Sequence, residues 1–457
     1  MPFDPHAYRD PRPLPWLIRA TGVLNRHVIL PRVLRLTAVD LPAADDARLR
    51  AVVHPAAAAF LAPNHPEFTT DWMLDKELAH RVSPLMAHWA SYGIVNVHPL
   101  AQRFWLALHL IANAPGGGGR SYSIAAARAG HGVLLHPEGT ATWCGDRIAP
   151  LVPGVAELAL EAAAAECRAP SGPNGANRRV FIVPIVWRLL FTGDVSRALD
   201  REVGRTARAL DIRLPEGAAL ESRFAALHTR LLAARSKRFG AMLREPSPEA
   251  LFAAQDALAD HLAARLRDRH GAPDEARQRW LHRVRRASRA LERSDPRTAR
   301  RDLALAREIE RLGRFSAAVY GGDSLTQEQI AESLQQIRSS LVTRGWRNAL
   351  HNLVPVAVAP RVARIRVPDP IEVSGPWCGC ARAQRDALVG ALHERMQGAL
   401  AQLGRTVAPH VDPWRRPNPF AATSGRGRPS RHSRPARADA LRLAIVPPLQ
   451  GPDPRVP

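Results

Sequence analysis

Lysine is nearly absent from this chain of 457 residues: Lys76 and Lys237 are the only two, so 62 of its 64 basic residues are arginine. Against 42 acidic residues, this gives a formal net charge of +22. So strong an arginine bias can partly reflect genomic base composition, but the charge itself favours anionic partners such as phospholipid headgroups, nucleotide-bearing cofactors or nucleic acid. Composition alone does not choose among these partners.

Long hydrophobic runs are also missing. No stretch of about 18 apolar residues occurs, so we expect no transmembrane helix. The first fifteen residues are polar and rich in proline, without the apolar core of a secretory signal, so we expect no export signal. These features predict a cytoplasmic protein.

Cysteine is scarce. The chain has four, Cys144, Cys167, Cys378 and Cys380, and without an export signal we expect them to be reduced thiols. The pair in Cys378-Gly379-Cys380 is too close for a redox C-x-x-C motif, and no second pair is present to complete a zinc site. The sequence therefore predicts no bound metal.

Apolar residues make up 46% of the chain, which is enough to build a core. Between about residues 50 and 190, short apolar segments that end in turn residues alternate with helical ones. This alternation indicates an α/β fold with a mostly parallel sheet flanked by helices. The expected strands cover residues 58–62, 132–135 and 180–186, and the expected helices cover residues 71–82 and 155–167.

From about residue 216, long charged amphipathic helices replace the strands, and no fixed repeat recurs. We expect helices at 248–268, 274–293, 296–312 and 326–343, the last with Asp323-Ser324 as its N-cap region. Strand-like character returns at 363–373, and a helix is expected at 381–403. The predicted organisation is an N-terminal amphipathic segment (1–40), an α/β domain (41–215), an all-helical insertion (216–350), a closing strand and helix (351–405) and a disordered basic tail (406–457).

The segment from residue 14 to 37 mixes large apolar residues with Arg19, Arg26, Arg32 and Arg35. This pattern predicts one or two short amphipathic helices, broken before Pro31. Two interpretations fit the pattern. The helices either cover the core or lie in a membrane interface, with their apolar face toward the lipid and their arginines toward anionic headgroups.

His65 stands in the segment Pro63-Asn64-His65-Pro66-Glu67-Phe68-Thr69-Thr70-Asp71-Trp72, directly after an expected strand. In α/β folds, reactive side chains gather where parallel strands end. A nearby Asp can bond one ring nitrogen and fix the tautomer, and the other nitrogen can then take a proton from a hydroxyl. Taken alone, a His close to an Asp is more typical of a structural pair.

A second polar segment, His136-Pro137-Glu138-Gly139-Thr140, also follows an expected strand. Glu138 and Thr140 could line a pocket there, and Gly139 permits close approach of the backbone to a ligand. A tight turn with a capping residue explains the same residues.

A third segment, Pro115-Gly116-Gly117-Gly118-Gly119-Arg120-Ser121, is rich in glycine. Its backbone N–H groups and the guanidinium of Arg120 suit a phosphate, although the Gly-Lys-Ser/Thr of a P-loop is absent. A flexible loop is the alternative interpretation.

Together these segments resemble one family. An Asn-His pair followed by an Asp, a glycine segment that ends in Arg, a Pro-Glu-Gly-Thr motif and the strand Ile182-Val183-Pro184-Ile185 occur in this order in the glycerolipid acyltransferases of the PlsC type. The resemblance covers about residues 55–190 and resumes at 363–403. It implies an acyltransferase-type fold.

The resemblance also implies roles for individual residues. His65 would be the general base and Asp71 its orienting partner. The substrate would be bound by Asn64, Arg120, Glu138, Gly139, Thr140 and Pro184. Among these, Arg120 would contact the acceptor phosphate, and Pro184 with its neighbours would line the acyl or thioester side.

Two departures from the family pattern affect the site. Five residues separate His65 from Asp71 where the family has four, and Thr70 stands at the usual Asp position. On a regular helix one residue turns a side chain by about 100°, so an irregular turn must precede the helix if Asp71 is the partner. Glu67 and Asp75 are the alternatives.

The second departure follows the Pro-Glu-Gly-Thr motif, where Ala141 and Thr142 replace the usual Arg or Ser. Arg147 or Arg128 could supply the missing phosphate contact, or the acceptor differs from a simple glycerol phosphate.

By this resemblance the protein would be an O-acyltransferase of phospholipid biosynthesis, similar to 1-acylglycerol-3-phosphate acyltransferases. It would move a fatty acyl group from acyl-CoA or acyl carrier protein to a (lyso)glycerophospholipid-type acceptor, without a bound cofactor. We expect peripheral contact with the inner membrane face, and no nucleic acid, because no recognised nucleic-acid motif accompanies the charge. The alternative is a catalytically altered lipid- or nucleic-acid-binding protein on the same fold.

Overall fold

The computed structural model describes residues 4, 7–114, 117–168, 178–272, 277–292, 294–342, 357–374 and 382–421. The chain divides into two compact units. The first comprises residues 1–195 and 343–413, and the second comprises residues 196–342 and 414–457. The second unit begins ahead of the boundary expected at residue 216, because helix α8 (Ser196–Ala209) packs against α9 (Leu220–Arg238) and α14 (Gln327–Ile337).

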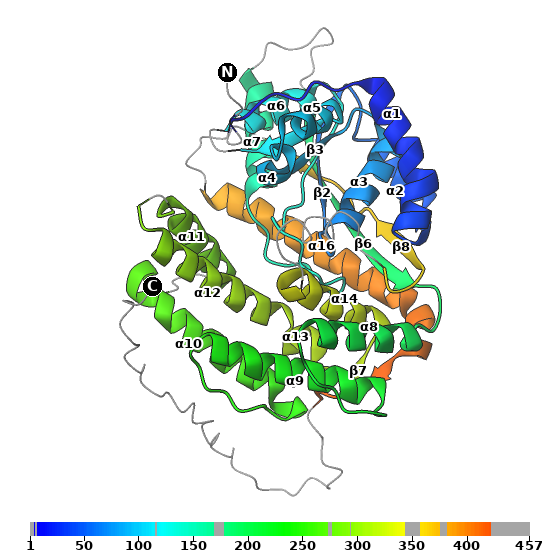
Figure 1. Ribbon diagram of the computed structural model, residues 1–457. Helices are drawn as coiled ribbons and strands as arrows, with labels where there is room; N and C mark the ends of the chain where they lie inside the picture. The colour runs from blue at the N-terminus through cyan, green and yellow to red at the C-terminus, as the bar shows by residue number, and fades with distance from the viewer. Residues whose placement is uncertain are drawn as a thin grey trace, which may run out of the picture. The chain divides into compact units, whose positions relative to one another are not determined.

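A mostly parallel sheet forms the centre of the first unit (Figure 1), as the sequence predicts. Within the described residues, its strands take the order β1-β8-β6-β2-β5-β3-β4, and β9 also pairs with β6. Strands β8 and β9 run antiparallel to β6, and the other pairs are parallel. The strands are β1 (Leu36–Asp40), β2 (Ala57–Pro63), β3 (Ala87–Ser91), β4 (Leu110–Asn113), β5 (Val133–Leu134), β6 (Arg179–Phe191), β8 (Arg361–Arg366) and β9 (Ile371–Val373).

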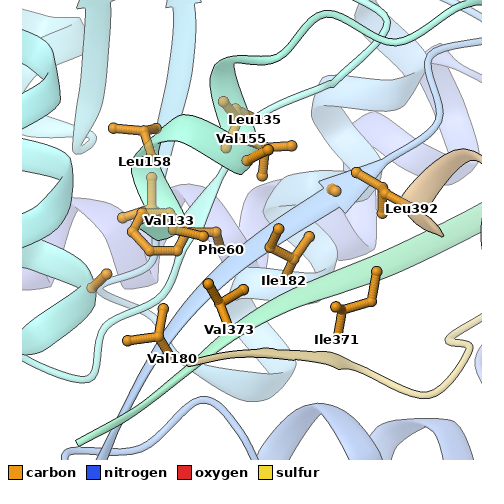
Figure 2. Close-up of a cluster of buried hydrophobic side chains, with 14 of the residues drawn as sticks. Phe60, Val133, Leu135, Val155, Leu158, Val180, Ile182, Ile371, Val373 and Leu392 are labelled. Atoms are coloured by element: carbon orange, nitrogen blue, oxygen red, sulfur yellow. The ribbon is translucent and has the colours of Figure 1, made fainter. Parts of the chain in front are cut away.

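Helices cover both faces of this sheet, and strand β2 shows why. All seven of its residues are buried, and its side chains alternate between two hydrophobic clusters, as the period of a strand requires. Phe60 lies in the cluster formed with α6, α7 and α16 (Figure 2), and Leu61 lies in the cluster formed with η1, α2 and α3. The helices of this unit are α1 (Pro15–Leu24), η1 (Asn25–Val33), α2 (Ala43–Arg50), α3 (Thr69–Val82), α4 (Tyr92–Val95), α5 (Pro99–Ala107), α6 (Gly118–Arg128), α7 (Gly154–Arg168) and α16 (Arg382–Val411).

The N-terminal helices differ from the prediction at Pro31. The chain continues as the π-helix η1 through Pro31 to Val33. The wider π turn accommodates the proline ring that an α-helix excludes, and the N–H of Leu34 donates to the carbonyl of Ile29. Ile18 and Leu30 are buried, so the inner face of these helices covers the core.

Pro184 lies inside the central strand β6, a position that usually excludes proline. Along one edge of β6, Val180–Ile182 pair with β9 and Val186–Phe191 pair with β8. Pro184 falls between these two pairings, opposite Ala62 of β2 on the other edge. Its missing N–H therefore costs no hydrogen bond on the β8–β9 side.

Within the described residues the second unit is mostly helical, with α10 against α12 and α11 against α12. It also holds a short antiparallel pair of strands, one of which lies at Ser324–Leu325, inside the segment expected to be all-helical. Helix α14 begins at a capping box in which Thr326 and Gln329 bond each other's backbone N–H, so the N-cap is Thr326 and not Asp323-Ser324. Its other elements are η2 (Pro248–Ala250), α10 (Leu251–His270), α11 (Arg277–Ala290), α12 (Pro296–Arg314), α13 (Ala317–Tyr320), β7 (Ser324–Leu325), η3 (Arg338–Val342) and β10 (Arg416–Pro417).

The expected disorder from residue 406 is wrong for the first part of the tail. Helix α16 runs on to Val411, because Leu403, Val407 and Val411 bury their side chains against Leu190 of β6. A short 3-10 helix, η4 (Asp412–Trp414), follows, and β10 pairs with β7. Residues 422–457 lie outside the described residues, as do Cys378 and Cys380, while Cys144 and Cys167 are free thiols.

The core of the first unit can be tested at Phe60, which is fully buried. Phe60→Ala leaves a cavity in a packed cluster, and we expect the free energy of unfolding of this unit to fall by about 3–5 kcal/mol. Val28→Ala, at a side chain that is 44% exposed, is the control and should change stability little. Urea unfolding followed by circular dichroism measures both, and equal effects of the two substitutions would contradict the assigned core.

Candidate active site

Two histidines and two aspartates meet at one edge of the parallel sheet. His65 follows the carboxyl end of β2, and His136 follows that of β5, the neighbouring strand. Asp71 and Asp75 lie four residues apart on α3, which places both carboxylates on the same face of that helix. This edge, beyond the carboxyl ends of parallel strands, is where α/β folds bind ligands.

His65 and Asp71 form the contact that the family resemblance implies. The Nδ1 atom of His65 lies 2.8 Å from Oδ2 of Asp71. Residues 64–68 form an irregular turn before α3 begins at Thr69, so Asp71 falls in the first helical turn. This turn absorbs the extra residue between the two side chains.

Asp71 is held by two further donors. The backbone N–H of Glu67 donates to Oδ2 at 2.6 Å, and the indole N–H of Trp187 on β6 donates to Oδ1 at 2.9 Å. The carboxylate is fully buried, and burial raises its pKa well above the usual range, with the charge of Glu67 adding to the rise and these two N–H donors opposing it. Asp71 therefore fixes both the position and the tautomer of the His65 ring.

The two alternative partners of His65 bind other groups. The Oδ2 atom of Asp75 lies 2.9 Å from Nε2 of His136. Glu67 forms a buried ion pair with Arg361 on β8. The site thus holds two separate His–Asp pairs, His65 with Asp71 and His136 with Asp75.

The rings of the two histidines stack face to face. Their centroids are 4.1 Å apart and their planes differ by 18°. The Nδ1 atom of His136 faces the carbonyls of Asn64 and Pro63 at 3.0 and 3.2 Å. Burial alone would lower the pKa of His136, but the charge and hydrogen bond of Asp75 and the Asn64 carbonyl outweigh it, and the pKa is raised.

Asn64 and Glu138, both expected to bind substrate, bond the protein backbone instead. The amide of Asn64 accepts from the N–H of Trp187 at 2.9 Å and donates to its carbonyl at 3.1 Å. Glu138 accepts from the N–H of His65 at 2.6 Å and from that of Ala149 at 2.7 Å. Both side chains are buried, and they hold the loop that carries His65.

The loop after Glu138 folds back onto His65. Gly139 has a φ of +71°, which explains the glycine, and Thr140 is half-buried. Thr142 donates from its backbone N–H to the His65 carbonyl at 2.8 Å. Trp143 is buried with a φ of +55°, a strained backbone of the kind that clusters at functional sites.

Arg120 lies elsewhere in this unit. Its guanidinium binds Glu157, at 3.0 Å, and Glu161, both on α7. The glycines before it start helix α6, where a Cβ on Gly118 would lie 2.3 Å from the Tyr8 ring. Gly118 and Gly119 therefore allow the close packing of this helix start against its neighbours. Pro184 is buried inside β6, as described above.

The two suggested replacements for the missing phosphate contact also differ in their surroundings. Arg128 binds Glu166 on α7 at 2.5 Å. The charge of Arg147 acts on Glu138, whose carboxylate contacts the His65 backbone.

Sequence reasoning assigned no role to His136, Trp187 or Thr142, and it gave Asp75 only as an alternative partner of His65. One signal pointed to the second pair: two aspartates four residues apart on an expected helix, and two histidines that each follow an expected strand. The Trp187 contact joins residues 116 positions apart, and no local pattern encodes it.

Within the described ranges, no group of three or more His, Cys, Asp or Glu is arranged to hold a metal ion, and no helix is long and apolar enough to cross a bilayer. In comparisons with known proteins, no family model and no curated protein matches this chain.

Glu138 should make the stability of the protein depend on pH. Burial raises the pKa of its carboxyl from 4.5 to about 7. The folded protein therefore keeps a proton that the unfolded chain has released, and this contribution to stability is complete below pH 4.5 and lost as the pH rises through 7. We expect the free energy of unfolding, relative to the Glu138→Gln variant, to fall by about 3 kcal/mol over this range.

Urea unfolding of both proteins at a series of pH values measures this difference. A difference that stays constant from pH 4.5 to 7 would show that Glu138 does not titrate as its burial requires.

Proposed function

We propose that the protein is an O-acyltransferase that moves a fatty acyl group from acyl-CoA or acyl carrier protein to a hydroxyl of a (lyso)glycerophospholipid-type acceptor, on an acyltransferase-type α/β fold. The observation that carries the proposal is the His65–Asp71 pair at 2.8 Å, at the carboxyl edge of the parallel sheet. The substrate class is inferred from the resemblance of the ordered motifs in residues 55–190 to those of the PlsC-type acyltransferases.

In the proposed reaction, His65 acts as the general base. Asp71 binds Nδ1, so Nε2 takes the proton from the acceptor hydroxyl as its oxygen attacks the thioester carbonyl. The carbon–oxygen bond forms, the carbon–sulfur bond breaks, and the departing thiolate takes up a proton. No covalent enzyme intermediate is needed, because the acceptor attacks the donor directly.

His65→Ala tests this role. General-base catalysis typically contributes a factor of about 10²–10⁴, so we expect kcat to fall by about that factor while the fold is retained. Purified protein is incubated with labelled acyl-CoA and either lysophosphatidate or glycerol 3-phosphate, and the acylated lipid is quantified.

His270→Gln is the matched control, because His270 forms a similar pair with Asp302, 2.9 Å apart, in the helical unit. It should leave the rate unchanged. Equal rates in the wild type and in a folded His65→Ala variant would remove the assigned mechanism.

A membrane contact through the N-terminal helices is part of the proposal. Their inner face covers the core, but their outer face exposes large apolar side chains between the arginines. Trp16 is 67% exposed and Val23 is 50% exposed, and Arg19 and Arg32 are exposed beside them. An apolar face with basic residues suits the interface of an anionic bilayer.

Trp16→Ser combined with Val23→Ser tests this contact. The double substitution removes apolar area without changing charge, so we expect binding to vesicles of phosphatidylglycerol and phosphatidylethanolamine to weaken several-fold in co-sedimentation. Met242→Ser, at a side chain that is 61% exposed in the helical unit, is the control. Unchanged binding by the double variant would rule out this surface.

The second candidate is a lipid-binding protein on the same fold that has lost catalysis. The observation that favours it is that Asn64, Arg120 and Glu138 all bind protein groups rather than an open site. Lipid binding by the wild type without acyl transfer to any tested acceptor would support this candidate over the enzyme.

A further inference from the structure

The second histidine, His136, lies against the first and takes no part in the proposed reaction. Contacts hold its ring at both nitrogens and on one face. Asp75 lies at Nε2, the carbonyls of Asn64 and Pro63 lie at Nδ1, and His65 stacks on one face. Trp187 packs edge-on, with a centroid distance of 6.0 Å. The oxygens at Nδ1 are carbonyls, which accept hydrogen bonds and cannot donate them. Nδ1 therefore carries a proton.

The remaining question is where the proton between Nε2 and Asp75 resides. Asp75 is 2% exposed and lies next to Lys76, whose ammonium acts on it. Burial lowers the pKa of Lys76 to about 8 and Asp75 opposes the shift, so the lysine is still charged at neutral pH. Burial raises the pKa of Asp75, and the charge and hydrogen bond of His136, with the charge of Lys76, oppose that rise. The same contact with Asp75 raises the pKa of His136. We therefore place the proton of this pair on His136, with Asp75 as the carboxylate.

We propose that His136 is a positioning residue, held by Asp75 as an imidazolium against the ring of His65, where it fixes the ring plane and disfavours a second proton on His65. The inference rests on the proposed function, because it explains how His65 would stay neutral and ready to act as a base. Like charges at stacking distance repel, so a cation 4.1 Å away makes protonation of His65 less favourable.

Other charged groups also influence whether His65 and His136 are protonated. Asp71, at Nδ1 of His65, favours protonation of that ring, and Glu138 contacts the His65 backbone and acts on His136. His88, on β3, is buried and responds to the charges of Lys76 and His136, which together with burial lower its pKa well below the ordinary value. Among these, His136 is the group that stacks on the face of the His65 ring.

The first test uses the native protein and needs no substrate. The nitrogen-15 shifts of labelled histidine rings, assigned with His136→Phe and His65→Gln, report the protonation of each ring nitrogen. We expect both nitrogens of His136 to carry protons at pH 7, where an ordinary histidine is mostly neutral, and His65 to carry one proton at the same pH. A His136 ring that is neutral at pH 7 would overturn the proposal, whether or not the protein transfers acyl groups.

The second test removes the charge. In Asp75→Asn, the buried His136 loses its counter-ion and becomes neutral, while its ring stays in place. His65 then accepts a second proton more readily, so we expect the acid limb of kcat/KM to move to higher pH by about one unit. His136→Phe should move it in the same direction. The same shift should appear in the His65 ring titration without substrate.

A purely structural role for His136 predicts a different result. Both variants would then lose activity by the same factor at every pH, and an unshifted profile would overturn the proposal. His270→Gln is the control and should leave the profile in place. Circular dichroism checks the fold of each variant. If neither variant folds, His136 is assigned as the ring whose signals shift most in His65→Gln, because the two rings stack, and its protonation state in the native protein decides the question.

Discussion

The buried carboxylate of Asp71 is the contact on which the candidate site depends. It joins three parts of the α/β unit: the turn after β2 through His65 and Glu67, helix α3 on which it lies, and the central strand β6 through Trp187. A buried carboxylate is costly unless donors surround it, so the three contacts must form together. This requirement fixes the turn before α3 and with it the orientation of His65.

Around this contact, polar side chains that were expected to bind a ligand instead form hydrogen bonds that hold the loop carrying His65. Asn64 bonds both backbone groups of Trp187, and Glu138 bonds two backbone N–H groups, one of them that of His65. The result is a rigid support in which His65 is placed by its backbone, by Asp71 and by the stacked His136. Such a supporting shell is what a precise general base requires.

Much of the α/β unit could be predicted from the sequence, because its buried parallel strands are continuous apolar runs that end in turn residues. Strands β2 and β6 and helix α3 are found close to the expected positions. Strands β1, β3 and β4 gave no such signal, since His88 and Trp89 in β3 and Thr37 in β1 interrupt the apolar pattern. Helix α16 extends past its expected end because contacts with Leu190, more than two hundred residues earlier, hold it.

The site was predictable to a smaller extent. The pairing of His65 with Asp71 could be predicted because both residues lie in one short segment. The sequence could say only that an irregular turn must precede the helix if the two residues pair. The second pair of His136 with Asp75 joins a loop and a helix 61 residues apart, and the ion pair of Arg120 with α7 likewise depends on tertiary packing. A side chain that looks suited to bind a ligand when one segment is considered alone can instead bind residues from a distant part of the chain.

The most direct test of the central claim is acyl transfer by the wild type and by Asp71→Asn with a panel of lysophospholipids and labelled acyl-CoA, read by mass spectrometry of the lipids. The account predicts that at least one acceptor is acylated by the wild type, and that Asp71→Asn lowers this rate by about 10²-fold or more while the protein stays folded. No acylated lipid from any acceptor, or equal product from both proteins, would contradict it.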